Sequence, residues 1–204
     1  MSVSVVPTSI FESIPASVPL MGNRFSRALG RGLLRLYGWK IRGHFPDQKK
    51  LMVIGAPHTS NWDFIIACLA ILATGLQVSV MMKQEAFFWP FKSLFIKLGF
   101  IPIDRQQAQG VAGQMVEWYD QHEQCWIGIT PEGTRAKVDN WKSGFLRIAY
   151  HANVPVLMVG LDFPSRSIVL VPELFYPSGN HEADLAVIRA FYADNFTGKN
   201  PERQ

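Results

Sequence analysis

The sequence predicts a single α/β domain in which helices flank a largely parallel central sheet. Strand-like apolar runs alternate with segments of helical periodicity along most of the 204-residue chain, an order typical of parallel sheets with helical crossovers. The length suits one domain with a sizeable buried core. The composition, 48% hydrophobic and 18% charged, is typical of a globular protein with much apolar surface. No internal repeat or low-complexity linker divides the chain.

Residues 1–22 are expected to form a disordered tail that precedes one domain over 23–200. Pro7, Pro15 and Pro19 stand among serines and valines in this segment, and N-terminal segments of this kind are commonly loose. No basic stretch opens the chain and Glu12 interrupts its first apolar run, so we expect no signal peptide.

The first helix, expected over 23–37, is basic and amphipathic. Its four arginines fall within a wedge roughly 80° wide at about 100° per residue, and four apolar residues fall on the opposite side. Such a helix is typical of proteins that lie in the headgroup layer of an anionic membrane. The alternative is an ordinary surface helix packed on the core with a solvated arginine face. The wedge contains Arg24, Arg27, Arg31 and Arg35, and the opposite side contains Phe25, Leu29, Leu33 and Leu36.

The 19 residues from Phe64 to Met82 carry no charge, which is near the length of a membrane span. Thr74 and Gly75 break this run, so we expect a buried helix at 61–73 and then a buried strand at 78–82.

The segment from Phe87 to Phe100 mixes aromatic residues with Lys92 and Lys97. Lysines around aromatic anchors suit a lipid interface, and the same aromatics suit core packing equally well. Further helices are expected at 85–98, 109–122, 141–152 and 181–196, and further strands at 38–45, 51–56, 100–103, 125–129, 155–161 and 167–171.

The stretch from Ala56 to Asp63 contains a histidine and an aspartate with four residues between them, just after the strand at 51–56. If a helix begins near Ser60, Asp63 lies in its first turn and can fold back toward His58. A carboxylate on one ring nitrogen fixes the tautomer and leaves the other nitrogen free to take a proton. The alternative is a helix N-cap with an acid in the first turn, which explains Ser60 and Asp63 but gives His58 no role.

Two later segments carry further motifs. The first runs from Gly99 to Arg105, and the second is Pro131-Glu-Gly-Thr-Arg135, which follows Thr130. With them the chain resembles the glycerolipid acyltransferase family, whose members carry four ordered blocks. The fourth block is matched by Val154-Pro155-Val156, although the second proline that many members carry is missing here. A segment from Trp141 to Gly144 resembles the family's aromatic-Lys-x-Gly sequence. The likeness covers roughly Lys40 to Asp162.

The resemblance implies acyl transfer to an alcohol, which needs a base because a neutral hydroxyl is a poor nucleophile. His58 is the candidate base and Asp63 its orienting partner. A phosphate on the acceptor needs planar cations, and the family assigns this role to the arginines that are Arg105 and Arg135 here. Substrate binding is also expected at the turn after the strand at 125–129. There Glu132 is expected to bind an acceptor hydroxyl or hold an arginine, Gly133 to adopt a positive φ, and the amides near Gly133 and Thr134 to stabilise an oxyanion.

Other classes of site find no support. Neither a G-x-S-x-G elbow nor a G-x-G-x-x-G fingerprint is present. No cluster has metal-ligand spacing, so no metal is expected, and Cys68 and Cys125 are expected as reduced thiols in apolar segments.

The expected protein is a peripheral enzyme on the cytoplasmic face of a membrane with an anionic surface. It moves a fatty acyl group from an acyl thioester, acyl-CoA or acyl carrier protein, to the free hydroxyl of a lysophosphatidate-like acceptor. No resident cofactor and no nucleic-acid partner are expected. A different acceptor such as a lyso-aminolipid is one alternative, and a non-catalytic membrane-binding protein is another.

Overall fold

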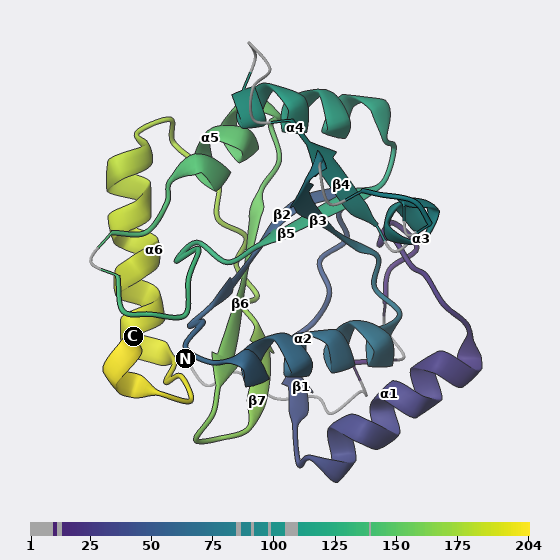
Figure 1. Ribbon diagram of the computed structural model, residues 1–204. Helices are drawn as coiled ribbons and strands as arrows, with labels where there is room; N and C mark the ends of the chain where they lie inside the picture. The colour runs from purple at the N-terminus through teal and green to yellow at the C-terminus, as the bar shows by residue number, and fades with distance from the viewer. Residues whose placement is uncertain are drawn as a thin grey trace.

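The computed structural model describes residues 10–11, 14–84, 87–90, 92–97, 99–104, 110–138 and 140–204. Its centre is a seven-stranded sheet in the order β1-β7-β6-β2-β5-β3-β4, in which all neighbouring strands are parallel except β6 and β7 (Figure 1). The expected α/β domain with a largely parallel sheet is therefore confirmed. The strands are β1 (Lys40–Arg42), β2 (Lys50–Ala56), β3 (Val78–Lys83), β4 (Phe100–Ile103), β5 (Cys125–Ile129), β6 (Val156–Asp162) and β7 (Ser167–Leu170).

Helices cover both faces of this sheet. The helices α4, α5 and α6 pack on one face, whereas α1 and α2 lie on the other, where α2 passes in front of the sheet (Figure 1). The helices are α1 (Arg24–Leu36), α2 (Asn61–Thr74), α3 (Lys92–Lys97), α4 (Gly110–Gln121), α5 (Gly144–His151) and α6 (His181–Asn195), with a short 3₁₀ turn, η2 (Pro201–Arg203), near the end of the chain. Among the described helices, none combines the length and apolar character needed to cross a bilayer.

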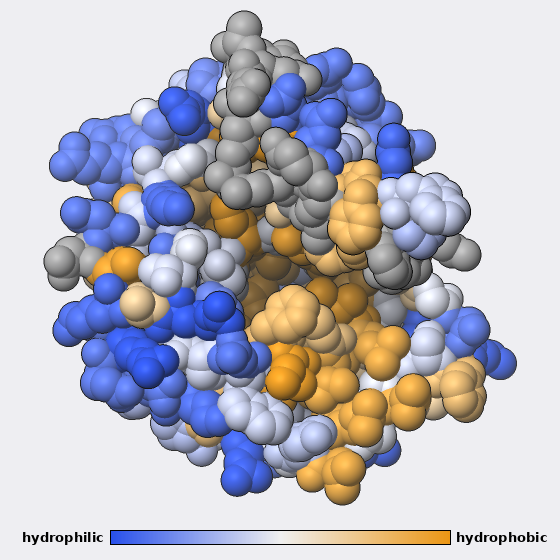
Figure 2. Space-filling view, viewed as in Figure 1, coloured by the Kyte–Doolittle hydropathy of each residue, from blue (hydrophilic) through white to orange (hydrophobic). Residues whose placement is uncertain are grey.

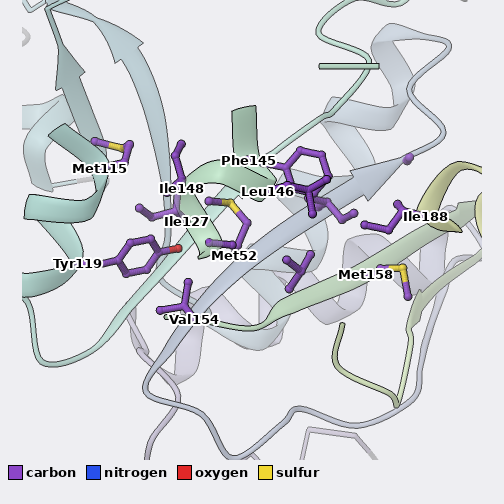
Figure 3. Packing of buried hydrophobic residues seen from close by; sticks show 14 of the residues in the cluster. Met52, Met115, Tyr119, Ile127, Phe145, Leu146, Ile148, Val154, Met158 and Ile188 are labelled. Carbon is purple, nitrogen blue, oxygen red and sulfur yellow. The ribbon is translucent and has the colours of Figure 1, made fainter. Parts of the chain in front are cut away.

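Strand β2 shows how the sequence divides the core. Its alternate residues Met52, Ile54 and Ala56 are fully buried against α4, α5 and α6, while Leu51 and Val53 point to the face that carries α2. Figure 3 shows Met52 and its neighbours converging with side chains from these helices. The strand is thus buried on both faces, as expected for the middle of a parallel sheet.

The segment before α1 corrects one expectation. Residues 14–22 do not form a loose tail, because Val18 is 3% exposed and the backbone N–H of Met21 donates to the Gly75 carbonyl. Ile10 is also buried against Phe45 and Trp126. The sequence could not show this contact because its partners come from far along the chain. Residues 1–9 and 12–13 lie outside the described residues.

Helix α1 packs on α2 through the face of Gly30 and Leu34, and not through the apolar side expected from the sequence. A Cβ on Gly30 would lie 2.4 Å from the Ala73 nitrogen, so only glycine lets the two helices approach this closely. Leu34 is buried beside it. Two of the four arginines turn inward: Arg31 donates to the Ala73 carbonyl, and Arg27 donates to the Met21 carbonyl. The arginine face of α1 is therefore not wholly solvated, because these two side chains bond to the backbone of the protein.

The apolar side of α1 is the side left uncovered. Phe25, Leu29 and Leu36 are 79%, 48% and 78% exposed. They lie opposite the packed face because the helix turns by about 100° per residue.

The helix expected at 85–98 is shorter in the structure. It spans Lys92–Lys97, and Phe87–Pro90 are not helical. Pro90 lacks an amide hydrogen and restricts the residue before it, which disfavours helix at this point. Of the aromatic residues here, Phe88 is 56% and Trp89 is 89% exposed.

Candidate active site

His58 and Asp63 lie together at the carboxyl end of β2. His58 lies in the four-residue connection that follows the strand, and Asp63 is in the first turn of α2. His58 Nδ1 is 3.3 Å from Asp63 Oδ2, and the two side chains are 18% and 3% exposed. A hydrogen on Nδ1 held by this carboxylate leaves the lone pair of Nε2 free to accept a proton. The geometry is that of an oriented base.

The same Asp63 carboxylate caps helix α2. Its Oδ2 accepts the backbone N–H groups of Thr59 and Ser60 at 2.6 and 2.7 Å, and its Oδ1 accepts the Ser60 hydroxyl at 2.7 Å. Burial by itself raises the pKa of Asp63, but the hydrogen bonds from His58, Ser60 and Thr59 outweigh it and hold the pKa below the ordinary value. Asp63 is therefore anionic at any pH at which His58 acts as a base.

Glu132 reaches the same loop from the end of β5. Its Oε1 accepts the backbone N–H of His58 at 2.8 Å, whereas its Oε2 is buried with no hydrogen-bond partner. The residue is 9% exposed, and this burial raises the pKa of its carboxyl despite the N–H of His58. Through Oε1 Glu132 fixes the backbone that carries His58, and among the described residues no arginine forms an ion pair with it.

The turn after β5 is built around Gly133, whose φ of +66° confirms the expected positive value. The Gly133 N–H donates to the Thr130 carbonyl at 3.1 Å, so this amide is already engaged and is not free for an oxyanion. Thr134 is exposed, and its hydroxyl oxygen accepts the N–H of Ala136. The amide of Thr134 is thus the better of the two candidates.

Arg135 is placed beside the start of α2. Its Nη1 donates to the side-chain oxygen of Asn61, and this contact joins the turn after β5 to the helix that carries Asp63. Arg105, the other arginine expected to bind phosphate, lies outside the described residues.

A large apolar cavity opens beside His58 and runs between α2 and the sheet. Its volume is about 730 Å³, within the range of about 300–1,000 Å³ usual for ligand sites. Figure 2 shows a hollow in this face, edged by hydrophobic side chains that lie over α2 and toward α1. Its walls include His58 and Asp63 together with the apolar side chains of Phe45, Trp126 and Leu170.

Two glycines help to form this space. Gly55 on β2 and Gly128 on β5 both line the cavity. A Cβ built on Gly55 meets no atom within 4 Å, so a side chain at this position would project into open space. The cavity could not be predicted from the sequence, because its walls come from segments separated by more than a hundred residues.

Lys142 also lines the cavity, and the residues by themselves predict no role for it. The signal was present only as the Trp141-Lys142-Ser-Gly144 likeness. Its backbone N–H donates to the Pro131 carbonyl at 2.9 Å, which ties it to the turn of Glu132 and Gly133.

Among the described residues, no group of three or more His, Cys, Asp or Glu side chains is placed to hold a metal ion. Cys68 and Cys125 are both free thiols, and burial raises the pKa of Cys125 to about 11. The described site combines the oriented histidine, two buried carboxylates and the apolar cavity.

A family model described as Acyltransferase matches residues 40–162. The chain belongs to this acyltransferase family. The matched range contains His58, Asp63, Glu132 and Lys142, so the candidate site of this acyltransferase lies within it.

Two relatives give the context. A "probable 1-acyl-sn-glycerol-3-phosphate acyltransferase" of Mycoplasma pneumoniae is 29% identical over 167 residues. That match covers 76% of the present chain, and the chain spans 61% of the length of the relative. The crystal structure of the 1-acyl-sn-glycerophosphate acyltransferase PlsC from Thermotoga maritima is similar with a TM-score of 0.56 at 19% identity, covering 84% of this chain and 78% of that one. At this identity the similarity shows the shared fold.

Proposed function

We propose that this acyltransferase moves a fatty acyl group from an acyl thioester to the free hydroxyl of a lysophosphatidate-like acceptor. The observation that carries the proposal is that the hydrogen-bonded His58–Asp63 pair lines the large apolar cavity. A base at the mouth acts on a hydroxyl, and an apolar cavity behind it holds an alkyl chain. The name of the Mycoplasma relative supports the same acceptor class.

The reaction follows from these positions. His58 Nε2 removes the proton from the acceptor hydroxyl as its oxygen attacks the thioester carbonyl carbon. Asp63 stabilises the imidazolium that forms. The tetrahedral intermediate collapses, the C–S bond breaks, and the leaving thiolate takes the proton from His58. The products are an ester and a free thiol, and the base returns to its starting state.

The cavity is proposed to hold the acyl chain of the thioester. Its walls beyond His58 are almost entirely aliphatic and aromatic, and burying each CH₂ there contributes about 0.8 kcal/mol. A chain bound in this way presents its carbonyl carbon at the mouth, next to the base. Coenzyme A and acyl carrier protein are both suitable carriers, because the proposed chemistry uses only the thioester. No resident cofactor is needed for these steps.

The surface around the mouth is proposed to rest on a membrane, on its cytoplasmic face. Phe64 and Ile65 on α2 are 66% and 41% exposed, and the uncovered side of α1 continues this apolar surface in Figure 2. Exposed hydrophobic patches of this extent mark interaction sites. A bilayer suits this one because a lysolipid acceptor is itself a component of the bilayer and reaches the mouth without leaving it.

The test is a panel of acceptors with one labelled acyl thioester, in which product masses are measured. The panel contains lysophosphatidate, a lyso-aminolipid and a monoacylglycerol of the same chain length. Formation of diacylated phosphatidate is the expected result. Product with the lyso-aminolipid alone would transfer the proposal to that acceptor, and no thioester consumption with any acceptor would contradict acyl transfer.

A further inference from the structure

The side chain of Lys142 lies across Gly133 at the mouth of the cavity. A Cβ on Gly133 would stand 3.0 Å from Lys142 Nζ and 3.1 Å from its Cε, so the absence of a side chain at Gly133 leaves room for the lysine. The backbone bond to Pro131 fixes the start of this side chain. Trp141, the preceding residue, packs against Tyr192 in the core, with ring centroids 5.6 Å apart. The lysine is therefore carried by an anchored segment.

The ammonium of Lys142 has no anionic partner in the part of the chain that the structure describes. The two acids of this site bond to other groups, although Oε2 of Glu132 has no partner. Asp63 is bound to His58 and to the start of α2, and Glu132 is bound to the His58 N–H. An exposed cation that lines a ligand cavity and has no protein partner is suited to an anionic group of the ligand.

We infer that Lys142 binds the phosphate of the acceptor and so holds its hydroxyl against His58. This role rests on the proposed function and adds a residue that determines which acceptor is used. A phosphomonoester carries a charge of about −1.5 to −2 at pH 7, which exceeds what one cation neutralises. Arg135, in the same turn, is available as a second cation, although its guanidinium also holds Asn61.

The exposure of Lys142 favours the phosphate over the reaction oxyanion. Groups that stabilise an oxyanion are preorganised and shielded from water, because only there is their electrostatic effect large. Lys142 is instead an exposed residue at the rim, where a lysine acts as a mobile point charge and accommodates a phosphate approaching from outside.

The experiment compares Lys142→Gln with wild type and with Lys137→Gln, an exposed lysine five residues earlier that does not line the cavity. The first readout is the Kd of a short-chain, water-soluble lysophosphatidate measured without any thioester, so that no reaction takes place. The second is kcat with saturating acceptor. Lys142→Gln should raise the Kd on the order of 10- to 100-fold, the effect of one charged hydrogen bond, while kcat changes little. Lys142→Arg should recover part of the affinity, and Lys137→Gln should resemble wild type.

An unchanged Kd with a lowered kcat in Lys142→Gln would assign Lys142 to the reaction oxyanion and overturn the inference. An equal loss of affinity in Lys137→Gln would also overturn it, because the effect would then be one of general charge. If wild-type protein neither binds nor acylates lysophosphatidate but acylates a phosphate-free acceptor, the proposed acceptor is refuted and this role with it. That result would appear in the wild-type protein, so it can be told apart from a result that refutes only the role of Lys142. Thermal unfolding of each variant verifies the fold.

Discussion

The Asp63 carboxylate that lies 3.3 Å from His58 Nδ1 also accepts the backbone N–H groups of Thr59 and Ser60, the two residues just before helix α2. Capping and orientation are therefore not competing explanations of this aspartate. The cap fixes the carboxylate, and the fixed carboxylate directs the histidine. An H-x4-D spacing allows both because four intervening residues cover the connection and the start of the helix.

Replacing His58 separates the two roles. His58→Ala should reduce acyl transfer by about 10²- to 10⁴-fold, because a positioned base is lost. Its free energy of unfolding should stay near that of wild type, since Asp63 keeps its bonds to Thr59 and Ser60. Transfer rates and urea unfolding measure the two quantities. Near-normal turnover by the folded variant would end the assignment of His58 as the base.

Asp63→Ala should lower both the rate of acyl transfer and the free energy of unfolding. The variant loses the orientation of His58 and also the cap of α2, which is worth about 0.5–2 kcal/mol of stability. The same two assays apply, with His58→Ala as the matched comparison. A variant that loses activity but no stability would show that the cap contributes nothing here.

Glu132→Gln should stabilise the protein at neutral pH. Burial raises the pKa of Glu132, so the folded state binds a proton more readily than the unfolded state. This carboxyl is therefore neutral in its energetic effect below the ordinary value of 4.5, and it destabilises the fold increasingly as the pH rises through the raised pKa. The amide keeps an acceptor for the His58 N–H without the buried charge.

The measurement for Glu132 is urea unfolding of wild type and Glu132→Gln at pH 7 and near pH 4. The advantage of the variant should be present at the higher pH and smaller at the lower one. Glu132→Ala, which removes the acceptor as well, is the control and should lose transfer activity. A Gln variant that is equally stabilised at both pH values would contradict the assigned cause.

Filling the cavity at Gly55 should shorten the acyl chains that the enzyme uses. A leucine there projects into open space, so long-chain thioesters should lose activity while short ones keep it. Gly32→Leu, at a glycine on α1 that also has open space but does not line the cavity, is the matched control. Competition between thioesters of different lengths gives the profile. An unchanged profile in folded Gly55→Leu would place the acyl chain elsewhere.

Membrane binding should depend more on the apolar side of α1 than on its arginines. Replacing Phe25, Leu29 and Leu36 with serine should release the protein from vesicles at low and high salt. Replacing the exposed Arg24 and Arg35 with glutamine should weaken binding only to anionic vesicles at low salt, by about 1 kcal/mol per residue. Arg27 and Arg31 are kept, because they hold α1 in place.

Vesicle co-sedimentation across a salt series measures this binding, and transfer to a water-soluble acceptor verifies that each variant is active. Unchanged sedimentation of the triple-serine variant would move the membrane contact to another surface, such as that of Phe88 and Trp89.

The order and approximate bounds of the helices and strands were predictable from the sequence, because these depend on local patterns. The strand at 125–129 and the strand at 100–103 match the structure residue for residue, and the expected helix at 61–73 differs from α2 by one residue. The His58–Asp63 pair was predictable for the same reason, since both residues lie within one connection and the first turn of the helix that follows it. The positive φ of Gly133 was predictable from a glycine in the turn that follows a strand.

Only the tertiary structure decided the contacts between distant segments. The bond from Glu132 to the His58 N–H joins residues 74 positions apart, and the cavity has walls from both halves of the chain. On α1 the periodicity correctly separated arginines from leucines, but the close approach of Gly30 to Ala73 determined which side is covered. Periodicity defines the faces of a helix, whereas packing chooses among them, and packing depends on side chains that no local pattern contains.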